Sequence, residues 1–524
     1  MNLIPKIILF PIIVLATFFL HEKKVKEIKT NDPPNIIYIL TDDLGYGDIS
    51  AFNPKGKIKT PHIDKLAKEG MMFTDAHTSS SVCTPTRYGI LTGRYNWRST
   101  LKSSVLTGKS KALIPNNRTT IASMLKKQGY KTAFIGKWHL GWDWALKNKE
   151  DKTGEGWDAK DFDNIDFSRP INNGPMDLGF DYSYGHSGSL DMAPYVYVEN
   201  RKPTEIPKKI TENTGKYSWW RKGPTSSDFD HEDVTPNFFR KAIRFVKENS
   251  NKKKPFFLYL ALPSPHTPIL PTREWQGKSG LNPYGDFVMM VDDYVGKLIS
   301  QVNASGISKN TLIIFTSDNG CSPAAKIDEL TAKGHYPSFI FRGHKADIFE
   351  GGHRVPFIVK WPSQITPNSK SDQTICTTDF MATVAEISNY KLKDNEGEDS
   401  FSMLPLLKNS FTGNSFRDAT VHHSINGSFA IRKGDFKLIL CADSGGWSFP
   451  KPGKDKDIIA ALPTMQLYNL KADPGEQHNL VNINPQKVKE LKQLLNKCIL
   501  DGRSTPGSNQ QNDSGNKWKQ LWWM

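Results

Sequence analysis

The sequence is poor in cysteine. Its 524 residues include only five, at positions 83, 321, 376, 441 and 498. No two of them form a CxxC pair and no spacing matches a zinc site, which excludes a structural zinc centre built on cysteines. In an exported protein an odd count leaves at least one cysteine unpaired. If Cys83 is set aside for chemistry, four remain, and the sequence does not determine whether they pair.

Long apolar runs are absent after the amino end. The run from Ile7 to Leu20 is too short to span a bilayer comfortably and matches the apolar region of a secretory signal. We therefore predict that residues 1–21 form a signal peptide, although the cleavage pattern is poor and an uncleaved anchor is the alternative. We expect an exported protein, periplasmic or secreted, without stable membrane insertion.

The sequence has fewer acidic than basic residues. It contains 54 Asp and Glu and 69 Lys and Arg, which gives a formal net charge of +15. Such a balance favours polyanionic partners, among them nucleic acid, acidic lipid and sulfated polysaccharide. Nucleic acid is disfavoured because the lysines are scattered and no binding module for it is present. A lysine-rich solvated surface without a partner is the other interpretation.

Four short apolar runs share one design. They end in polar residues and read "NIIYILTDD" (35–43), "TAFIGKWH" (132–139), "FFLYLALPSPH" (256–266) and "LIIFTSDN" (312–319). Continuous apolar runs of this length, separated by helical stretches, predict buried strands of a mostly parallel sheet covered by helices on both faces. Ligand sites in such α/β folds lie beyond the carboxyl ends of the strands. The polar ends should therefore meet at one edge of the sheet.

The pattern of apolar and polar residues changes after about residue 407. "SFAIRKGDFKLIL" (428–440) alternates around a turn signal and predicts an antiparallel hairpin, and "NPQKVKELKQLLNKCILDG" (484–502) predicts an amphipathic helix. We predict a catalytic domain over residues 33–407, a smaller C-terminal α+β domain with an antiparallel sheet over 408–503, and a linker with a Trp-rich tail over 504–524. Residues 200–232 are interpreted as an inserted surface loop.

The predicted sheet edge carries a hard-cation site. Asp42, Asp43, Asp318 and Asn319 offer only oxygen ligands, which favour calcium, with magnesium as the alternative, over zinc. Cationic and imidazole side chains would surround the ion: Arg87, Lys137, His139, His266 and Lys345. A divalent cation with several fixed positive charges suits a tetrahedral oxyanion. The reaction class is transfer or hydrolysis of a phosphate or sulfate ester.

The sequence resembles the type I sulfatases in several motifs. "CTPTR" at 83–87 matches their CxPxR motif, and further motifs follow in the order of the family: "DDLGYGD" (42–48), "TPHIDKLAKEG" (60–70), "GKWHLG" (136–141), "PHTP" (265–268), "SDNG" (317–320), "EGGHRVP" (350–356) and "DPGEQHNL" (473–480). The similarity extends over about residues 34–507. One mild departure is Thr86, where many relatives have serine or alanine before the arginine.

The resemblance implies an alkaline-phosphatase-like fold and a sulfatase mechanism. Cys83 would be oxidised to formylglycine (3-oxoalanine) by a formylglycine-generating or an anaerobic sulfatase-maturating enzyme. One hydroxyl of the hydrated aldehyde would attack sulfur, and the other would expel sulfate. By motif, residue 83 would bind one Ca²⁺ together with Asp42, Asp43, Asp318 and Asn319.

The remaining roles are also carried over from the family. Arg87 and Lys137 would hold the formylglycine, and His139 would assist the elimination of sulfate. Lys137, His266 and Lys345 would contact the sulfate group, with His266 or Lys345 protonating the leaving oxygen. Ser189, in "GHSGSLD", matches a substrate-binding serine by position only.

The motifs do not identify the alcohol that carries the sulfate. The basic surface and the Trp-bearing segment "YSWWRKGP", with Trp219 and Trp220, favour an exo-acting enzyme on sulfated oligosaccharides. We expect algal polysaccharides such as ulvan, carrageenan or porphyran as the source, with glycosaminoglycans as the alternative. Two further alternatives are a phosphatase or phosphodiesterase of the same fold and a sulfoglycan-binding protein in which Cys83 is never converted. Packing of the two tryptophans onto the domain is the structural alternative to sugar stacking.

Overall fold

The central sheet has ten strands, and its middle is built from the four apolar runs. The computed structural model describes residue 1, residues 32–148 and residues 150–524, so the predicted signal peptide lies outside the described residues. The strand order is β13 (Ser369–Ser371), β2 (Met71–Phe73), β12 (Phe357–Lys360), β11 (Thr311–Ser317), β1 (Asn35–Thr41), β10 (Phe256–Ala261), β4 (Lys131–Lys137), β5 (Tyr182–His186), β6 (Val198–Glu199) and β7 (Lys202–Pro203). The segment from β11 to β5 is parallel throughout, which confirms the predicted mostly parallel sheet.

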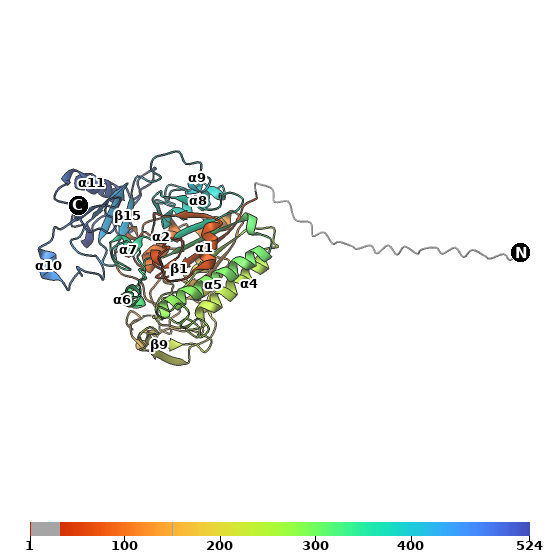
Figure 1. Cartoon of the computed structure of the whole chain (residues 1–524). Helices are drawn as coiled ribbons and strands as arrows, with labels where there is room; N and C mark the ends of the chain where they lie inside the picture. Colours follow the sequence, from red (N-terminus) through yellow and green to blue (C-terminus); the bar gives the residue numbers. More distant parts are fainter. Residues whose placement is uncertain (2–31, 149) are drawn as a thin grey trace. The chain divides into compact units, whose positions relative to one another are not determined.

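Helices cover both faces of this sheet. Phe256 and Phe257 are neighbours in β10 and therefore point to opposite faces. Phe256 contacts Phe245 of α4 (Val234–Asn249), whereas Phe257 contacts Phe380 of α8 (Phe380–Ile387). With α4 lie α5 (Pro283–Ala304) and α1 (Pro61–Lys68); with α8 lie α2 (Cys83–Thr92) and α3 (Ile121–Lys127) (Figure 1). The expected sandwich of helices and sheet is confirmed.

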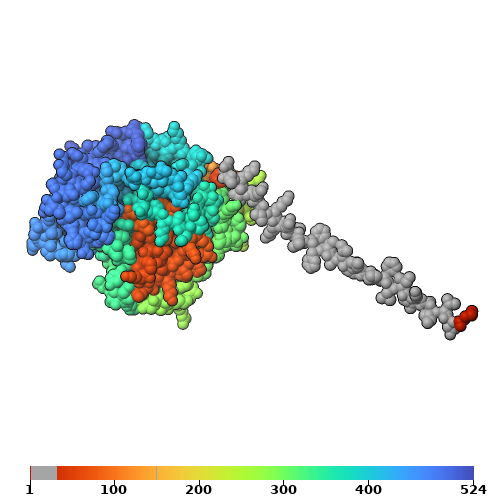
Figure 2. Space-filling model, turned by 45° about the horizontal axis from the view of Figure 1, so that its top comes forward, coloured from red at the N-terminus to blue at the C-terminus, as the bar shows by residue number. Residues whose placement is uncertain are grey.

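A second, smaller sheet follows in the chain. Its four antiparallel strands are β15 (Thr420–His423), β16 (Phe429–Lys433), β17 (Phe436–Ile439) and β18 (Gln466–Asn469), with α11 (Pro485–Leu500) packed against β16 and β17. The hairpin between β16 and β17 turns at Gly434, whose φ of 57° favours glycine. These C-terminal elements gather at one side of the unit formed by residues 33–524 (Figure 2). The predicted hairpin, antiparallel sheet and helix are confirmed.

Shorter elements complete the described chain. They are β3 (Ala76–His77) paired with β14 (Ile375–Cys376), β8 (Lys209–Asn213) paired with β9 (Trp220–Thr225), α6 (Ile327–Ala332), α7 (Glu350–His353), α9 (Leu404–Leu407) and α10 (Lys456–Ala460). Within residues 200–232, predicted as an inserted surface loop, the structure contains the two-stranded β8–β9 ribbon, which the sequence analysis did not predict. No helix of the described residues combines the length and hydropathy needed to cross a membrane. None of the five cysteines, all of which are among the described residues, takes part in a disulfide bond.

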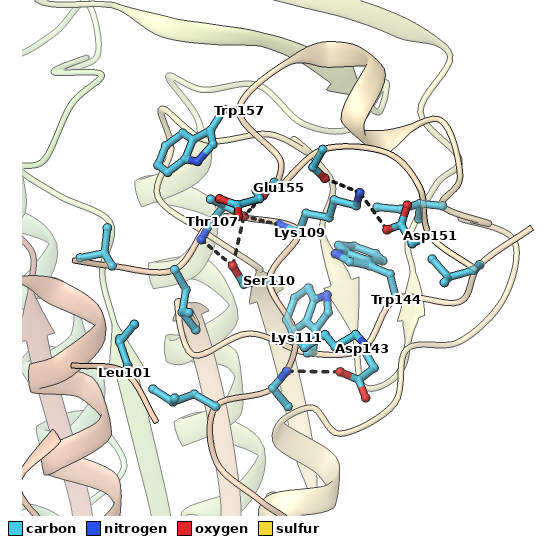
Figure 3. Close-up of a pocket in the computed structure, with 18 of the residues that line it drawn as sticks. Leu101, Thr107, Lys109, Ser110, Lys111, Asp143, Trp144, Asp151, Glu155 and Trp157 are labelled. Carbon is cyan, nitrogen blue, oxygen red and sulfur yellow. Dashed lines mark hydrogen bonds and ion pairs between the residues drawn. The ribbon is translucent and has the colours of Figure 1, made fainter. Parts of the chain in front are cut away.

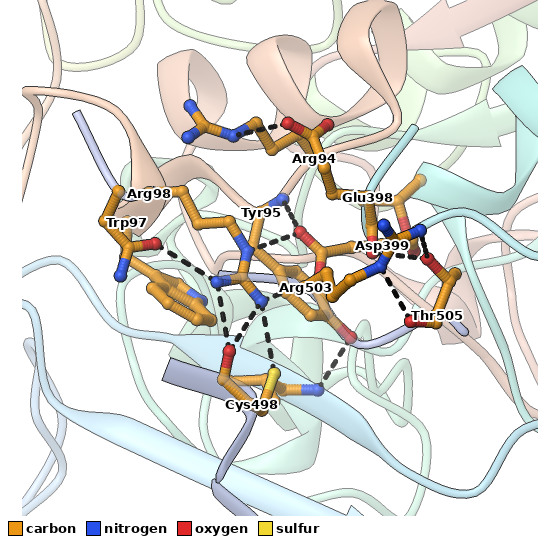
Figure 4. Close-up of polar contacts among 12 residues, drawn as sticks. Arg94, Tyr95, Trp97, Arg98, Glu398, Asp399, Cys498, Arg503 and Thr505 are labelled. Atoms are coloured by element: carbon orange, nitrogen blue, oxygen red, sulfur yellow. Dashed lines mark hydrogen bonds and ion pairs between the residues drawn. The ribbon is translucent and has the colours of Figure 1, made fainter. Parts of the chain in front are cut away.

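The last twenty residues lie against the body of the protein. Asn512 accepts a hydrogen bond from Arg98 at 3.1 Å, and the Trp523 side chain is 5% exposed. Arg98 also forms a two-point ion pair with Asp399, with distances of 2.7 and 2.9 Å, and both side chains are fully buried (Figure 4). Arg98 thus joins three segments, its own and two that lie about 300 and 400 residues away from it in the sequence.

We predict that Asp399→Ala will lower the free energy of unfolding by about 3–5 kcal/mol, because it leaves the buried Arg98 guanidinium without its counter-charge. Urea unfolding followed by circular dichroism measures the change. The matched control is Asp233→Ala, which breaks an exposed pair with Arg240 and should cost less than about 1 kcal/mol. Equal effects of the two substitutions would contradict the prediction.

Candidate active site

The carboxyl ends of four adjacent strands bring the predicted polar residues together. Asp42 and Asp43 follow β1, and Asp318 and Asn319 follow β11 beside it. Lys137 is the last residue of β4, while His266 lies on the loop after β10. Gly136 has a φ of 128°, and a Cβ at this position would lie 1.8 Å from the Ala261 carbonyl oxygen. Glycine is therefore required for β4 to end beside β10.

Cys83 is the first residue of α2 and is 2% exposed. Its Sγ lies 3.5 Å from Oδ1 of Asp42. Arg87 stands one helical turn later, so the CxPxR spacing presents both side chains on one face of the helix. Burial, followed by the nearby Asp42 carboxylate, raises the pKa of the Cys83 thiol. An unmodified thiol at this position is therefore a poor nucleophile.

The Arg87 guanidinium is fully buried beneath the site. Its Nη2 lies 2.8 Å from Asp318 Oδ2 and 3.2 Å from Asp42 Oδ2, and Nη1 donates to the Lys137 carbonyl at 2.8 Å. Arg87 thus joins the ends of three strands and neutralises part of the charge of two carboxylates. A buried arginine without such partners would be strongly destabilising.

Two lysines and a histidine face the aspartates from the other sides. Lys137 Nζ contacts Asp42, and Lys345 Nζ lies 2.7 Å from Asp43 Oδ1. His266 Nε2 lies 3.6 Å from Asp43 Oδ2, while its Nδ1 is 2.5 Å from the Thr267 carbonyl. The Nδ1 hydrogen is thereby directed to the backbone, and Nε2 is the nitrogen directed toward the site.

This arrangement of charges shifts the pKa values of the site residues. Burial alone would raise the pKa of Asp42, but Lys137, His266 and Arg87 hold it well below its usual range. Burial and the adjacent Asp42 raise the pKa of Asp318 to about 6. Lys345 is desolvated by burial, yet the carboxylate of Asp43 raises its pKa above the ordinary value. Lys345 consequently stays protonated and supplies a fixed positive charge.

Two carboxylates and a buried amide oxygen offer donors for a hard divalent cation. Ligand-type atoms of Asp42, Asp43, Cys83 and His266 lie within 4.8 Å of one another, and the carboxylates of Asp42 and Asp43 are the hard donors among them. Asn319 donates through its amide to Asp43 at 2.7 Å, whereas its Oδ1 is buried and has no hydrogen-bond partner among the described residues. A buried amide oxygen of this kind is a suitable ligand for calcium. Asp318 is close by, but its carboxylate is engaged by Arg87 and by the Asp43 amide.

His139 and Ser189 each carry a buried polar atom without a hydrogen-bond partner among the described residues. His139 adopts a φ of 53°, and its Nε2 lies 2.7 Å from the Leu106 carbonyl oxygen. The two unpartnered atoms are Nδ1 of His139 and the hydroxyl oxygen of Ser189. Such polar atoms are usually satisfied by a ligand or water.

One buried group near the site escaped the sequence analysis. His186 ends β5, its Nε2 also lacks a partner within the described chain, and its ring stacks on Phe238. Burial and the charge of Lys137 lower the pKa of His186 to about 3, so the imidazole is neutral. The signal that could have found it is "GHSGS", a polar stretch that ends a fifth parallel strand.

The sheet edge, the oxygen donors and the fixed cations define a hydrolase for esters of tetrahedral oxyanions, on an alkaline-phosphatase-like fold. The Sulfatase family model matches residues 34–390, and the chain belongs to this family. It is therefore a sulfuric ester hydrolase, as the CxPxR resemblance predicted.

Named relatives are similar over almost the whole chain. N-acetylgalactosamine-6-O-sulfatase of Bacteroides thetaiotaomicron is 32% identical, over 93% of this chain and 97% of that protein. Human arylsulfatase A is 29% identical, over 91% and 90% of the two chains. A solved Bacteroides thetaiotaomicron sulfatase, from work on the metabolism of multiple glycosaminoglycans, superposes with a TM-score of 0.76 at 31% identity and covers 88% of this chain and 98% of its own.

Proposed function

We propose that this protein is an exo-acting carbohydrate sulfatase that removes sulfate from a sulfated amino sugar, with Cys83 converted to formylglycine. The observation that carries the proposal is the position of Cys83, whose Sγ lies 3.5 Å from Asp42 and within 4.8 Å of a carboxylate oxygen of Asp43, while the buried Arg87 contacts the same Asp42. Formylglycine supplies a hydrated aldehyde whose hydroxyl groups serve as nucleophile and as the handle for sulfate release. The modification also explains why a buried thiol of raised pKa stands at the centre of the site.

A calcium ion would be held by Asp42, Asp43, Asp318, Asn319 and residue 83. The three carboxylates face three cationic side chains, namely Arg87, Lys137 and Lys345, so these six groups together are neutral. The ion supplies two further positive charges for a sulfate group. Elemental analysis of the purified, matured protein should find one calcium per chain; zinc instead of calcium would contradict this assignment.

The chain's own residues perform the binding and proton-transfer steps. Lys345 and Lys137 hold the charged oxygens of the sulfate, because both ammonium groups are buried and fixed by aspartates. The Nδ1 hydrogen of His266 is directed to the Thr267 carbonyl, so His266 Nε2 accepts rather than donates, and the protonated Lys345 beside Asp43 is the group that supplies a proton to the leaving oxygen. His139 Nδ1 is the buried nitrogen available to assist the release of sulfate.

The relatives support an amino-sugar substrate. N-acetylgalactosamine-6-sulfatases of Bacteroides thetaiotaomicron and of mouse align with 93% and 86% of this chain. These names favour the glycosaminoglycan alternative of the sequence analysis, and the preference for algal polysaccharides remains a prediction without such support. Burial of His266, Lys345 and Ser189 favours exo action, since a terminal sugar enters an enclosed site more easily than the middle of a polymer.

Kinetics of the matured enzyme on defined sugars test the proposal. We expect kcat/KM for 6-sulfated N-acetylgalactosamine to exceed that for carrageenan-derived oligosaccharides and for the 6-phosphate ester by about tenfold or more. The phosphate ester is the matched control, because it differs only in the transferred group. Equal or faster turnover of the phosphate ester would overturn the sulfatase assignment, and faster turnover of the algal oligosaccharides would overturn the choice of substrate.

A further inference from the structure

A large pocket lies one backbone segment away from the catalytic residues. Its volume is about 1150 Å³, and its walls come from residues 100–113 and 142–165 (Figure 3). None of the residues to which a catalytic role is given above lines it. The segment between the two sites is fixed at Leu106, whose carbonyl oxygen lies 2.7 Å from His139 Nε2 and whose amide donates to Thr84 at 3.2 Å.

The pocket is held open by hydrogen bonds across its walls. Thr107 donates to the Glu155 carbonyl at 2.6 Å, and the Trp144 indole donates to the Gly108 carbonyl at 3.0 Å. A Cβ at Gly108 would lie 2.0 Å from the Ala193 carbonyl oxygen, so this segment also packs tightly against the one that carries Ser189. The shape of the pocket is therefore built into the fold and does not depend on closure around a ligand.

An aromatic and cationic rim connects the pocket with the site. Trp157 lines the pocket and remains 44% exposed. The Arg221 guanidinium lies 4.9 Å from the Trp157 ring and 4.7 Å from the ring of Trp219. Arg221 is anchored by Asp191, two residues beyond Ser189, and donates to its backbone carbonyl at 3.2 Å. The rim thus runs from Asp191, two residues beyond the serine matched by position to a substrate-binding residue, to an exposed indole.

The charged residues that line the pocket carry no excess of positive charge. They are four acids, Asp143, Glu150, Asp151 and Glu155, and three lysines, Lys109, Lys111 and Lys152, and Lys109 pairs with Asp151 at 2.8 Å. A second sulfate would therefore find no surplus of cations there. Lysines and carboxylates in one pocket with an exposed tryptophan instead suit a sugar ring, whose hydroxyl groups can hydrogen-bond to both kinds of charge and whose apolar face stacks on the indole.

The geometry points to a second carbohydrate subsite in this pocket, which binds an unsulfated sugar unit of the same oligosaccharide next to the sulfated terminal unit. Trp157 is its stacking platform, and Arg221 holds the orientation of Trp157 through Asp191. The inference rests on the proposed carbohydrate sulfatase function. It assigns Trp157 as a specificity residue for chain length, remote from sulfate cleavage.

Kinetics on two substrates of different length test this subsite. The pair is 6-sulfated N-acetylgalactosamine and a tetrasaccharide that carries the same sugar at its non-reducing end. Trp157→Ala should raise KM for the tetrasaccharide about tenfold, leave its kcat unchanged, and leave both constants for the monosaccharide unchanged. Trp157→Phe retains an aromatic face and should recover most of the affinity. Ile483→Ala, at a residue that is 78% exposed, controls for truncation of a surface side chain.

The outcomes separate the two proposals. Equal loss of kcat/KM on both substrates in Trp157→Ala, or no change on either, would overturn the subsite while the sulfatase function stands. A fall in kcat with KM unchanged would make Trp157 a structural support of the catalytic residues and would also overturn it. Absence of turnover by the parent enzyme on both sulfated sugars would overturn the proposed substrate class, and the subsite with it.

Discussion

Substitution of Cys83 by alanine should reduce turnover by at least about 10⁴-fold, because it removes the group from which the nucleophile is made. The fold should remain intact. The side chain is small, and among the described residues its Sγ makes one hydrogen bond, the 3.5 Å contact with Asp42. Loss of the sulfur atom should therefore change the free energy of unfolding by about 1 kcal/mol or less. Single-turnover kinetics and urea unfolding of the same preparation measure the two effects.

Cys376→Ala is the matched control for this prediction, since Cys376 is also a buried free thiol but belongs to β14. It should keep the activity of the parent. Mass spectrometry of the tryptic peptide 69–87 from the native host should show an aldehyde in place of the Cys83 thiol. An unmodified thiol in a fully active enzyme, or a global loss of structure in Cys83→Ala, would contradict the assignment of residue 83.

Much of the central sheet could be predicted because its strands are buried on both faces. The run Ile36–Leu40 within β1 is apolar throughout and is followed closely by Asp42 and Asp43, so both the strand and its functional end are visible in the sequence. The polar ribbon β8–β9, in contrast, could not be predicted from the sequence. Its residues are mostly half-exposed or exposed, so no apolar alternation marks it.

The two adjacent tryptophans of the inserted segment show a second feature that the sequence could not predict, namely which of the two side chains is exposed. Trp220 stacks on His231 with ring centroids 4.0 Å apart, so it packs onto the domain as the structural alternative predicted. Trp219 is 37% exposed and contacts Arg221. Neighbouring residues in a strand point to opposite sides, and only the register of the strand decides which of them is available to a sugar.

The backbone contacts between the C-terminal sheet and the catalytic segments could not be predicted. Ser80, three residues before Cys83, donates to the His423 carbonyl at 2.8 Å across 343 residues of sequence. Ala346, beside Lys345, accepts a hydrogen bond from the Ile425 amide at 3.1 Å. The edge of the small C-terminal sheet therefore supports two catalytic segments. Backbone hydrogen bonds of this kind leave no trace in residue type, whereas the CxPxR motif does, because its chemistry requires particular side chains.

Arg87 carries the second large expected effect. Arg87→Met should lower the free energy of unfolding by about 3–5 kcal/mol, because the buried carboxylates of Asp42 and Asp318 lose the cation that lies between them. It should also reduce kcat/KM by at least about 10³-fold, since Arg87 fixes Asp42 and the end of β4 beside residue 83. Urea unfolding and steady-state kinetics give the two numbers.

Two further variants separate charge from geometry at this position. Arg87→Lys retains the positive charge but not the planar fork that reaches Asp318, Asp42 and the Lys137 carbonyl at once, so it should recover part of the stability and little of the activity. Arg244→Met, which breaks an exposed pair with Glu248 on α4, should change stability by less than about 1 kcal/mol. If Arg87→Lys were as active as the parent, a positive charge alone would suffice, and Arg87 would not act by positioning the strand ends around residue 83.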